Sequence, residues 1–245
     1  LMAAELRAAG VDFSFAPVVD LNRGLSGVIG DRAFADDPDL VGRLAGAWML
    51  GAREAGMVSV GKHFPGHGGV VADSHTELPV DERAMDDLAV EDLRPFARLI
   101  DNGLEGVMPA HVIFSACDRE PAGFSRYWLQ DILRGRLRFQ GVIFSDDLSM
   151  AAAQHAGCYA ERAHAALKAG CDMVLVCNNP DGAREVLEKS QEFTLGHLNT
   201  VYHVGYPYSY VFTQTDKGTN TYNYAGVSFR IPALDYRRDG DRVLE

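Results

Sequence analysis

The stretch from Lys62 to His75 concentrates side chains that can bind ligands and move protons. It holds one lysine, three histidines and one aspartate within fourteen residues, interrupted by glycines and a proline. An apolar run at residues 57–61 precedes it and predicts a buried strand. In α/β proteins the loops after the strands carry the functional residues, so this stretch predicts a site at the carboxyl edge of a sheet.

Asp73 and His75 are separated by a single residue. In an extended segment alternate side chains point the same way, so we expect the two to lie side by side. A carboxylate beside an imidazole fixes its tautomer and raises its pKa, which makes a proton shuttle. The alternative is an exposed loop histidine with a chance acidic neighbour.

Asp146 follows an apolar run at residues 142–144 and Ser145. A carboxylate at the end of a buried strand is costly unless it is satisfied or used. When ionised, it can act as a nucleophile toward an electrophilic carbon. The alternative is a helix N-cap, and for Asp147 we expect the cap.

Lys62, His63 and Arg32 supply hydrogen-bond donors. Such donors suit a ligand that is rich in hydroxyl and carbonyl groups. The alternative is that they form salt bridges with Asp20 or Asp146.

The chain around these residues alternates between predicted helices and apolar strands. The strands are expected at residues 11–20, 57–61, 107–112, 141–146 and 172–177. The helices are expected at residues 1–9, 38–56, 86–102, 125–138, 151–169 and 181–190. This alternation is typical of a parallel sheet built from βα units.

Every predicted strand is followed or ended by polar residues, namely Asp20, Lys62 with His63, His111, Asp146 and Asn178. In a (β/α)8 barrel all strand ends meet at one mouth, whereas a doubly wound sheet gathers them at a switch point. Five consecutive polar strand ends favour an α/β fold of the TIM-barrel type. Because such a barrel needs about eight strands, we expect an incomplete barrel whose early βα units are missing.

The formal net charge of −11 argues against nucleic acid and anionic membrane surfaces as partners. No apolar run approaches the roughly 20 residues that a membrane span needs. The four cysteines show no CxxC spacing, which favours reduced thiols in a reducing compartment. We therefore expect a cytoplasmic protein, and the sequence does not define its oligomeric state.

The two ends of the chain differ from its centre. Residues 1–9 are helix-like and charged, unlike a signal peptide, and we expect the natural chain to start earlier. Seven of the nine tyrosines lie in residues 191–245, where runs at 201–206 and 222–229 predict antiparallel strands joined by a turn near 215–220. We expect residues 1–190 to form a partial barrel domain. Residues 191–245 are either a divergent extension or a segment from another reading frame or gene.

Three motifs, KHFPGHG at residues 62–68, DSH at 73–75 and SDDLSM at 145–150, occur in this order. Together they resemble the bacterial β-N-acetylglucosaminidases of glycoside hydrolase family 3. The resemblance covers residues 1 to about 190. It implies a retaining glycosidase that removes terminal β-linked N-acetylglucosamine from recycled peptidoglycan fragments in the cytoplasm, without a metal or another cofactor.

The resemblance also implies roles for individual residues. Asp146 matches the nucleophile that forms a covalent glycosyl-enzyme, and His75 matches the general acid/base. Asp73 matches the partner of that histidine. The residues that match those holding the N-acetylglucosamine are Arg32, Lys62 and His63. The family has at least two further βα units that carry an acidic sugar-binding motif, and residues 1–12 do not match that motif.

Two other functions remain open at this point. A metal-dependent barrel hydrolase could draw its ligands from His63, His67, Asp73, His75 and His111. Neither HxH nor HExxH spacing occurs, however. The other is a truncated or fused product that keeps the motifs and lacks activity.

Overall fold

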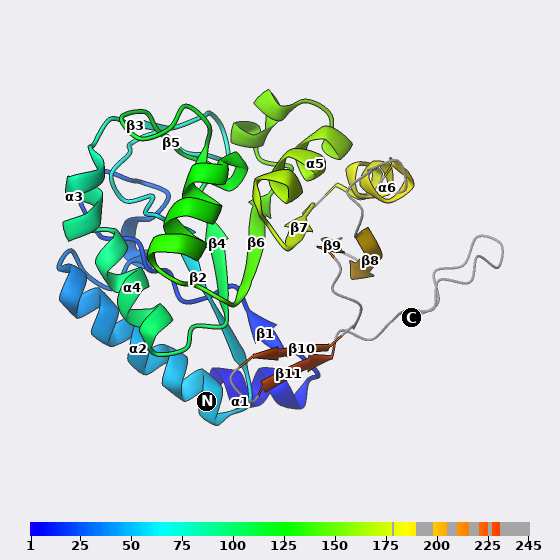
Figure 1. The fold of residues 1–245 in the computed structure, drawn as a ribbon. Coiled ribbons are helices and arrows are strands. Elements are labelled where there is room, and N and C mark those ends of the chain that lie inside the picture. Colours follow the sequence, from blue (N-terminus) through cyan, green and yellow to red (C-terminus); the bar gives the residue numbers. More distant parts are fainter. Residues whose placement is uncertain (178, 190–197, 205–209, 216–220, 225–226, 231–245) are drawn as a thin grey trace.

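The computed structural model describes residues 1–177, 179–189, 198–204, 210–215, 221–224 and 227–230, and Figure 1 shows their arrangement. Five parallel strands form one open sheet in the order β1-β2-β4-β6-β7. They are β1 (Phe13–Ser14), β2 (Val58–Phe64), β4 (Gly106–Pro109), β6 (Val142–Asp147) and β7 (Met173–Leu175). The predicted parallel α/β arrangement is confirmed.

Strand β1 is much shorter than expected. Pro17 has no N–H to donate, which interrupts the ladder, and pairing with β2 returns at Val18, opposite Lys62. The N–H of Val19 donates to the Lys62 carbonyl, so the chain still runs beside β2 as far as Asp20. Because the chain continues beside β2 after β1 ends, Asp20 lies at the carboxyl edge of the sheet.

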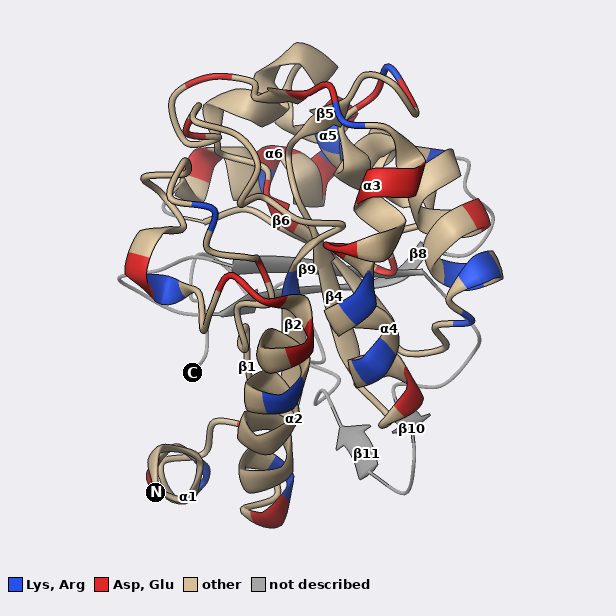
Figure 2. Ribbon diagram, turned by 90° about the vertical axis from the view of Figure 1, so that its left-hand side faces the viewer, with Lys and Arg blue, Asp and Glu red and all other residues tan. Residues whose placement is uncertain are grey.

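The helices cover the outer face of the sheet (Figure 1). The longer ones are α1 (Met2–Ala8), α2 (Pro38–Glu54), α4 (Leu93–Asp101), α5 (Tyr159–Ala169) and α6 (Pro180–Lys189), with a π-helix, η3 (Tyr127–Arg136). Shorter elements are η1 (Gly30–Arg32), β3 (Val80–Asp81), α3 (Met85–Val90), β5 (Ile113–Phe114), η2 (Ala122–Phe124) and η4 (Ala151–Ala156). Both α2 and α4 carry acidic and basic positions (Figure 2).

Two predicted helices are each divided in the structure. The helix expected at 86–102 is split into α3 and α4, and Asp92 between them is buried in ion pairs with Arg23 and Arg83. The helix expected at 151–169 is split at Gly157, whose φ of +99° does not fit a helix.

Alternate residues of the strands enter two separate cores, as expected for near-continuous apolar parallel strands. On the helix side, Val107, Ile143 and Val174 pack among helix residues that include Trp128 and Phe96. On the opposite side the cluster is formed by Val60, Met108, Val142, Phe144, Met173 and Leu175. The sheet is therefore covered by apolar side chains on both of its faces.

The described part of the C-terminal segment contains two antiparallel strand pairs. β8 (Leu198–Val204) pairs with β9 (Tyr210–Thr215), and β10 (Thr221–Tyr224) pairs with β11 (Val227–Arg230). The run at 222–229, which we expected to be one strand, contributes to both β10 and β11. The expected turn lies, apart from Thr215, outside the described residues, and the division of the chain at residue 190 stays a prediction. Among the described helices, none is long and apolar enough to cross a bilayer.

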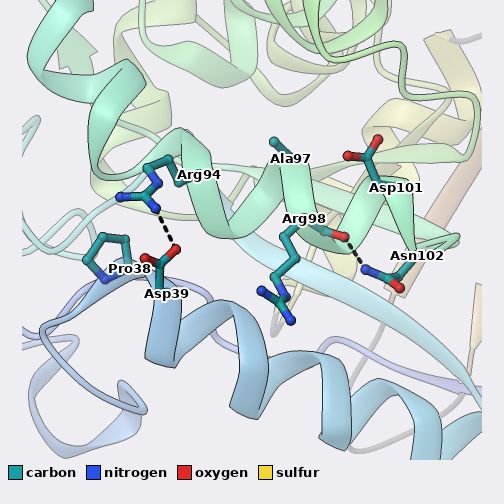
Figure 3. A pocket seen from close by; sticks show the side chains of 7 residues that line it. All are labelled: Pro38, Asp39, Arg94, Ala97, Arg98, Asp101 and Asn102. Atoms are coloured by element: carbon teal, nitrogen blue, oxygen red, sulfur yellow. Dashed lines mark hydrogen bonds and ion pairs between the residues drawn. The ribbon is translucent and has the colours of Figure 1, made fainter.

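A surface groove of about 350 Å³ lies between α2 and α4 (Figure 3). At one end of it Arg94 forms an ion pair with Asp39 at 2.6 Å. The residues that line it are Pro38, Asp39, Arg94, Ala97, Arg98, Asp101 and Asn102. None of the sequence-predicted site residues lines this groove, so it is separate from the strand ends.

Candidate active site

The carboxyl ends of the strands bring the predicted residues together. Lys62 and His63 lie near the end of β2, and Asp146 is the penultimate residue of β6. Asp20 follows β1, and His111 comes two residues after β4. The strand ends therefore form one polar edge, as the sequence predicted, although Asn178 lies outside the described residues.

Asp146 is surrounded by groups that favour its ionised form. Its Oδ1 accepts the backbone N–H of Asp147 at 2.8 Å. Burial by itself raises the pKa of Asp146, but nearby His63, His111 and Lys62, together with this N–H, hold the pKa below its ordinary value of 3.8. Asp146 is therefore a carboxylate at neutral pH, as a nucleophile must be.

Lys62 lies close enough to Asp146 to be affected by its charge, and Arg32, on a different element, lies close enough to affect Lys62. Burial lowers the pKa of the half-buried Lys62, Asp146 and Asp20 oppose this shift, and the charge of Arg32 adds to it. Arg32 ends η1 on the surface, where its Nε donates to the Val28 carbonyl at 2.8 Å. Among the ion pairs of the described residues, none joins either cation to a carboxylate, so both keep donors for a ligand.

Asp20 organises the stretch that follows β2. It is 1% exposed and accepts the Nδ1–H of His63 at 2.7 Å and the backbone N–H of His67 at 2.6 Å. Burial raises the pKa of Asp20, but the bonds and charges of these two histidines bring it below 3.8. The sequence raised Asp20 only as an alternative salt-bridge partner, and for His63 that alternative is what the structure shows.

Replacing Asp20 by asparagine is expected to lower the free energy of unfolding at pH 7 by about 2 kcal/mol, because charged hydrogen bonds of this kind contribute about 1.5–3 kcal/mol. The pKa of Asp20 is lowered on folding, so its contribution is present above pH 3.8 and is lost as the pH falls through the folded value. Urea unfolding at pH 7 and pH 3.5 measures this. A difference between wild type and variant that grows on acidification would contradict the assignment.

Asp73 and His75 form the expected pair, but through a different backbone geometry. The His75 Nδ1–H donates to Asp73 Oδ1 at 2.7 Å, and the backbone N–H of His75 donates to the same oxygen at 2.9 Å. The segment is a turn, in which Thr76 and Glu77 donate to the Asp73 carbonyl, so the expectation of an extended segment is wrong. The side chain of His75 is 60% exposed and that of Asp73 is 42% exposed, which leaves Nε2 of His75 accessible for proton transfer.

The pKa of Asp73 is lowered first by the backbone N–H of His75 and then by its side chain. The turn itself is attached to the segment after β6, because the Ala152 N–H donates to the Ser74 carbonyl at 3.2 Å. On its other side the Ser74 hydroxyl hydrogen-bonds Nε2 of the buried His67 at 3.0 Å. Burial lowers the pKa of His67, so the link is made by a neutral ring. The turn is thus joined both to the β2 loop and to the loop that follows Asp146.

Asp147 joins the ends of β6 and β7. Its carboxylate accepts the Ser149 N–H and the Cys177 N–H, each at 2.9 Å. The expectation that it caps a helix is wrong, because η4 begins only at Ala151 and has Met150 at its N-cap. Burial and the two neighbouring aspartates raise the pKa of the Cys177 thiol, which is therefore protonated.

Gly68 allows the β2 loop to lie directly on the segment after β1. A Cβ at this position would be 2.0 Å from the backbone carbonyl oxygen of Leu21. Gly51 in α2 is the opposite case, since a Cβ there meets nothing within 4 Å. This contact was not predicted from the sequence.

Gly68→Ala is expected to destabilise the chain by about 1–3 kcal/mol, the usual cost of overpacking against atoms that cannot move aside. Gly51→Ala is the matched control, and we expect it to stabilise by up to about 1 kcal/mol because alanine favours a helix interior. The midpoints of urea unfolding compare the two. Equal effects of the two substitutions would show that the contact with Leu21 is unimportant.

Among the described residues, no group of three or more His, Cys, Asp or Glu side chains is arranged to hold a metal ion. His63 and His67, which could have been ligands by type, are engaged by Asp20 and Ser74. The four cysteines, all within the described residues, are free thiols.

Comparison with known proteins adds the family to this geometry. The sequence profile described as "Glycosyl hydrolase family 3 N terminal domain" matches residues 1–200. The chain belongs to glycosyl hydrolase family 3. It is 64% identical over 188 residues to a protein of Thioalkalivibrio sulfidiphilus named "Beta-hexosaminidase", covering 77% of this chain and 54% of the relative. A Methylococcus capsulatus protein of the same name is 59% identical over 194 residues, covering 79% and 58%.

A solved crystal structure is similar in fold. NagZ from Neisseria gonorrhoeae, solved in complex with N-trifluoroacetyl-D-glucosamine, has a TM-score of 0.72 and 50% sequence identity, covering 79% of this chain and 54% of that protein. The family expected from the three motifs is therefore confirmed. The chain spans about half the length of the curated relatives that it matches.

Proposed function

We propose that this chain carries the catalytic residues of a retaining β-N-acetylglucosaminidase. The observation that carries the proposal is the ionised Asp146 at the end of β6, with the Asp73–His75 turn attached through Ser74 to the loop that follows it. A carboxylate and a separate proton-transfer group are the parts that a double-displacement glycosidase needs. The names of the 64% and 59% identical relatives support the substrate class.

In the first step the Asp146 carboxylate attacks the anomeric carbon of the sugar. The bond to the glycosidic oxygen breaks, and that oxygen takes the proton from Nε2 of the His75 imidazolium, while Asp73 holds Nδ1–H. In the second step His75 removes a proton from water, and the oxygen of that water displaces Asp146 from the anomeric carbon. Two inversions give overall retention of configuration.

An imidazole in place of the usual second carboxylate has a physical advantage here. A second fixed carboxylate near Asp146 would repel its charge and raise one of the two pKa values. Neutral imidazole avoids this repulsion, and the Asp73 carboxylate stabilises the imidazolium form when it is needed.

The sugar-holding residues in this proposal are Arg32, Lys62 and His63. Lys62 is close enough to influence Asp146 electrostatically, Arg32 is close enough to influence Lys62, and both have donors for hydroxyl or carbonyl oxygens. His63 contributes from the same strand end, oriented by Asp20 at 2.7 Å. The substrate we propose is a saccharide or muropeptide that derives from peptidoglycan and carries a terminal β-linked N-acetylglucosamine. We propose that the reaction takes place in the cytoplasm.

We also propose that the five-stranded sheet belongs to a (β/α)8 barrel of which this chain supplies a part. In this proposal residues 1–190 form the hydrolase portion, and residues 191–245 are a separate strand-forming segment. Among the described residues the sheet ends at β1 and β7 without closing on itself, and its face opposite the helices carries an apolar cluster, as such a partial barrel requires.

Incubation of the full chain with p-nitrophenyl N-acetyl-β-glucosaminide tests the proposal. We expect release of nitrophenol, and proton NMR during the first minutes should show the β-anomer of N-acetylglucosamine before mutarotation. Activity should survive EDTA, whereas loss with EDTA and recovery with zinc would favour a metal-dependent hydrolase. Folded chain without turnover would instead support a catalytically impaired product.

A further inference from the structure

We propose that His111 is a positioning residue for the nucleophile, which it holds in place through the backbone of Asp147. The proposal rests on the function proposed above, because it assigns the nucleophile to Asp146. His111 was noted in the sequence only as a polar strand end and a candidate metal ligand, and the two displacement steps do not use it.

The His111 side chain is completely buried among the described residues. The side chain is 0% exposed, and its ring stacks on Phe124 with centroids 5.3 Å apart and planes 11° from parallel. Gly123 lies beside the same ring, where an added Cβ would be 3.5 Å from Nδ1. The ring is therefore fixed in orientation by η2 before any ligand is present.

One ring nitrogen makes a hydrogen bond whose direction is unambiguous. Nε2 of His111 is 3.2 Å from the backbone carbonyl oxygen of Asp147, and a carbonyl can only accept. The proton must therefore lie on Nε2. Nδ1 has no hydrogen-bond partner among the described residues, and complete burial disfavours a charged ring. The geometry thus selects the neutral form protonated on Nε2.

Together with the hydrogen bond from His111, three residues hold Asp147 in place. His111 holds its carbonyl, and Ser149 and Cys177 hold its carboxylate through their backbone N–H groups. The backbone N–H of the same residue donates to Oδ1 of Asp146 at 2.8 Å. A fixed Asp147 therefore presents a fixed donor to the nucleophile, which orients the carboxylate for attack.

The charge state of the His111 ring also bears on how the Asp146 carboxylate is oriented. Asp146, Asp147 and His155 act electrostatically on the His111 ring, but burial has the larger effect on its pKa and favours the neutral form. A neutral ring can hold the loop without forming an ion pair that would compete with the reacting carbon for the carboxylate. The role is positioning, since His111 does not touch the reacting atoms.

Two substitutions separate the donor from the shape of the ring. His111→Phe keeps an aromatic ring against Phe124 and removes the donor, whereas His111→Gln places an N–H near the position of Nε2. We expect His111→Phe to lower kcat for p-nitrophenyl N-acetyl-β-glucosaminide by about 10- to 100-fold with KM little changed, because a buried carbonyl and the segment behind it lose their donor. His111→Gln should recover most of that loss. Urea unfolding of both variants checks that they are folded.

A second measurement does not depend on activity. In the ¹⁵N-labelled full chain at pH 7, the imidazole resonances that disappear in His111→Gln identify His111, and we expect a neutral ring protonated on Nε2. A charged ring, or one protonated on Nδ1, would overturn the proposal. So would a folded His111→Phe variant with wild-type kcat, which would leave the proposed function intact. If the wild-type chain itself shows no turnover, the proposed function fails for this chain, and the ring state still decides the proposal about His111.

Discussion

Asp146→Gly is expected to abolish turnover of p-nitrophenyl N-acetyl-β-glucosaminide, with a loss in kcat of at least about 10⁴-fold, the scale on which hydrolases lose activity when their nucleophile is removed. Asp146 lies at the end of β6 in ionised form, and Lys62 and His63 would hold the sugar beside it. Without the carboxylate, no covalent glycosyl-enzyme can form, and the first displacement has no attacking group.

Added azide provides the distinguishing readout for the same variant. The space that the Asp146 side chain leaves can admit an azide ion, which attacks the anomeric carbon from that face and displaces nitrophenolate. A single displacement inverts the configuration, so we expect recovered nitrophenol release with the α-glycosyl azide as product. Asp181→Asn, at a carboxylate that is 90% exposed, serves as control and should have wild-type kcat. A β-configured azide product, or full activity without azide, would contradict the assignment of Asp146.

His75→Gln is expected to reduce hydrolysis of a disaccharide with a poor leaving group by about 10²- to 10⁴-fold, the usual contribution of general acid catalysis. Nitrophenolate needs no protonation to depart, so the first step with the aryl substrate should be nearly unaffected. Water attack in the second step still needs a base, and the variant should therefore show a burst of nitrophenol followed by a slow steady state. Rapid-mixing absorbance measurements resolve the two phases.

The Asp73→Asn variant is the matched comparison for this dyad. Its amide oxygen can still accept the Nδ1–H of His75, so the tautomer is kept while the negative charge that stabilises the imidazolium is lost. We expect a loss in kcat that is smaller than that of His75→Gln, with the same difference between substrates. Unchanged hydrolysis of the disaccharide by His75→Gln would remove His75 from the mechanism.

Much of the fold could be predicted because the signals are local. The apolar runs around Val60, Val107, Ile143 and Val174 lie in parallel strands of one sheet, and their polar ends meet at one edge. Helix positions were also predictable from apolar periodicity. The predicted helices failed at Asp92 and Gly157, where a buried ion-pair network and a positive φ interrupt the periodicity.

Parts of the site were predictable for the same reason. The Asp73–His75 pair has partners two residues apart, so its existence followed from spacing, and only its turn geometry did not. Asp147 shows the limit of this reasoning. An aspartate followed two residues later by serine is compatible with a helix cap or with a turn, and the bond to the Cys177 N–H, which is distant in sequence, belongs to the turn.

By itself, the sequence determined the parallel α/β class, the strand ends and the residue types placed there, because strand periodicity and side-chain chemistry are properties of short segments. Only the tertiary structure decided which of those residues contact one another. Asp20 binds His63 across 43 residues, and His111 binds the Asp147 carbonyl across 36. These contacts depend on how neighbouring strands align and where each loop turns, and that alignment is set by the packing of the whole sheet.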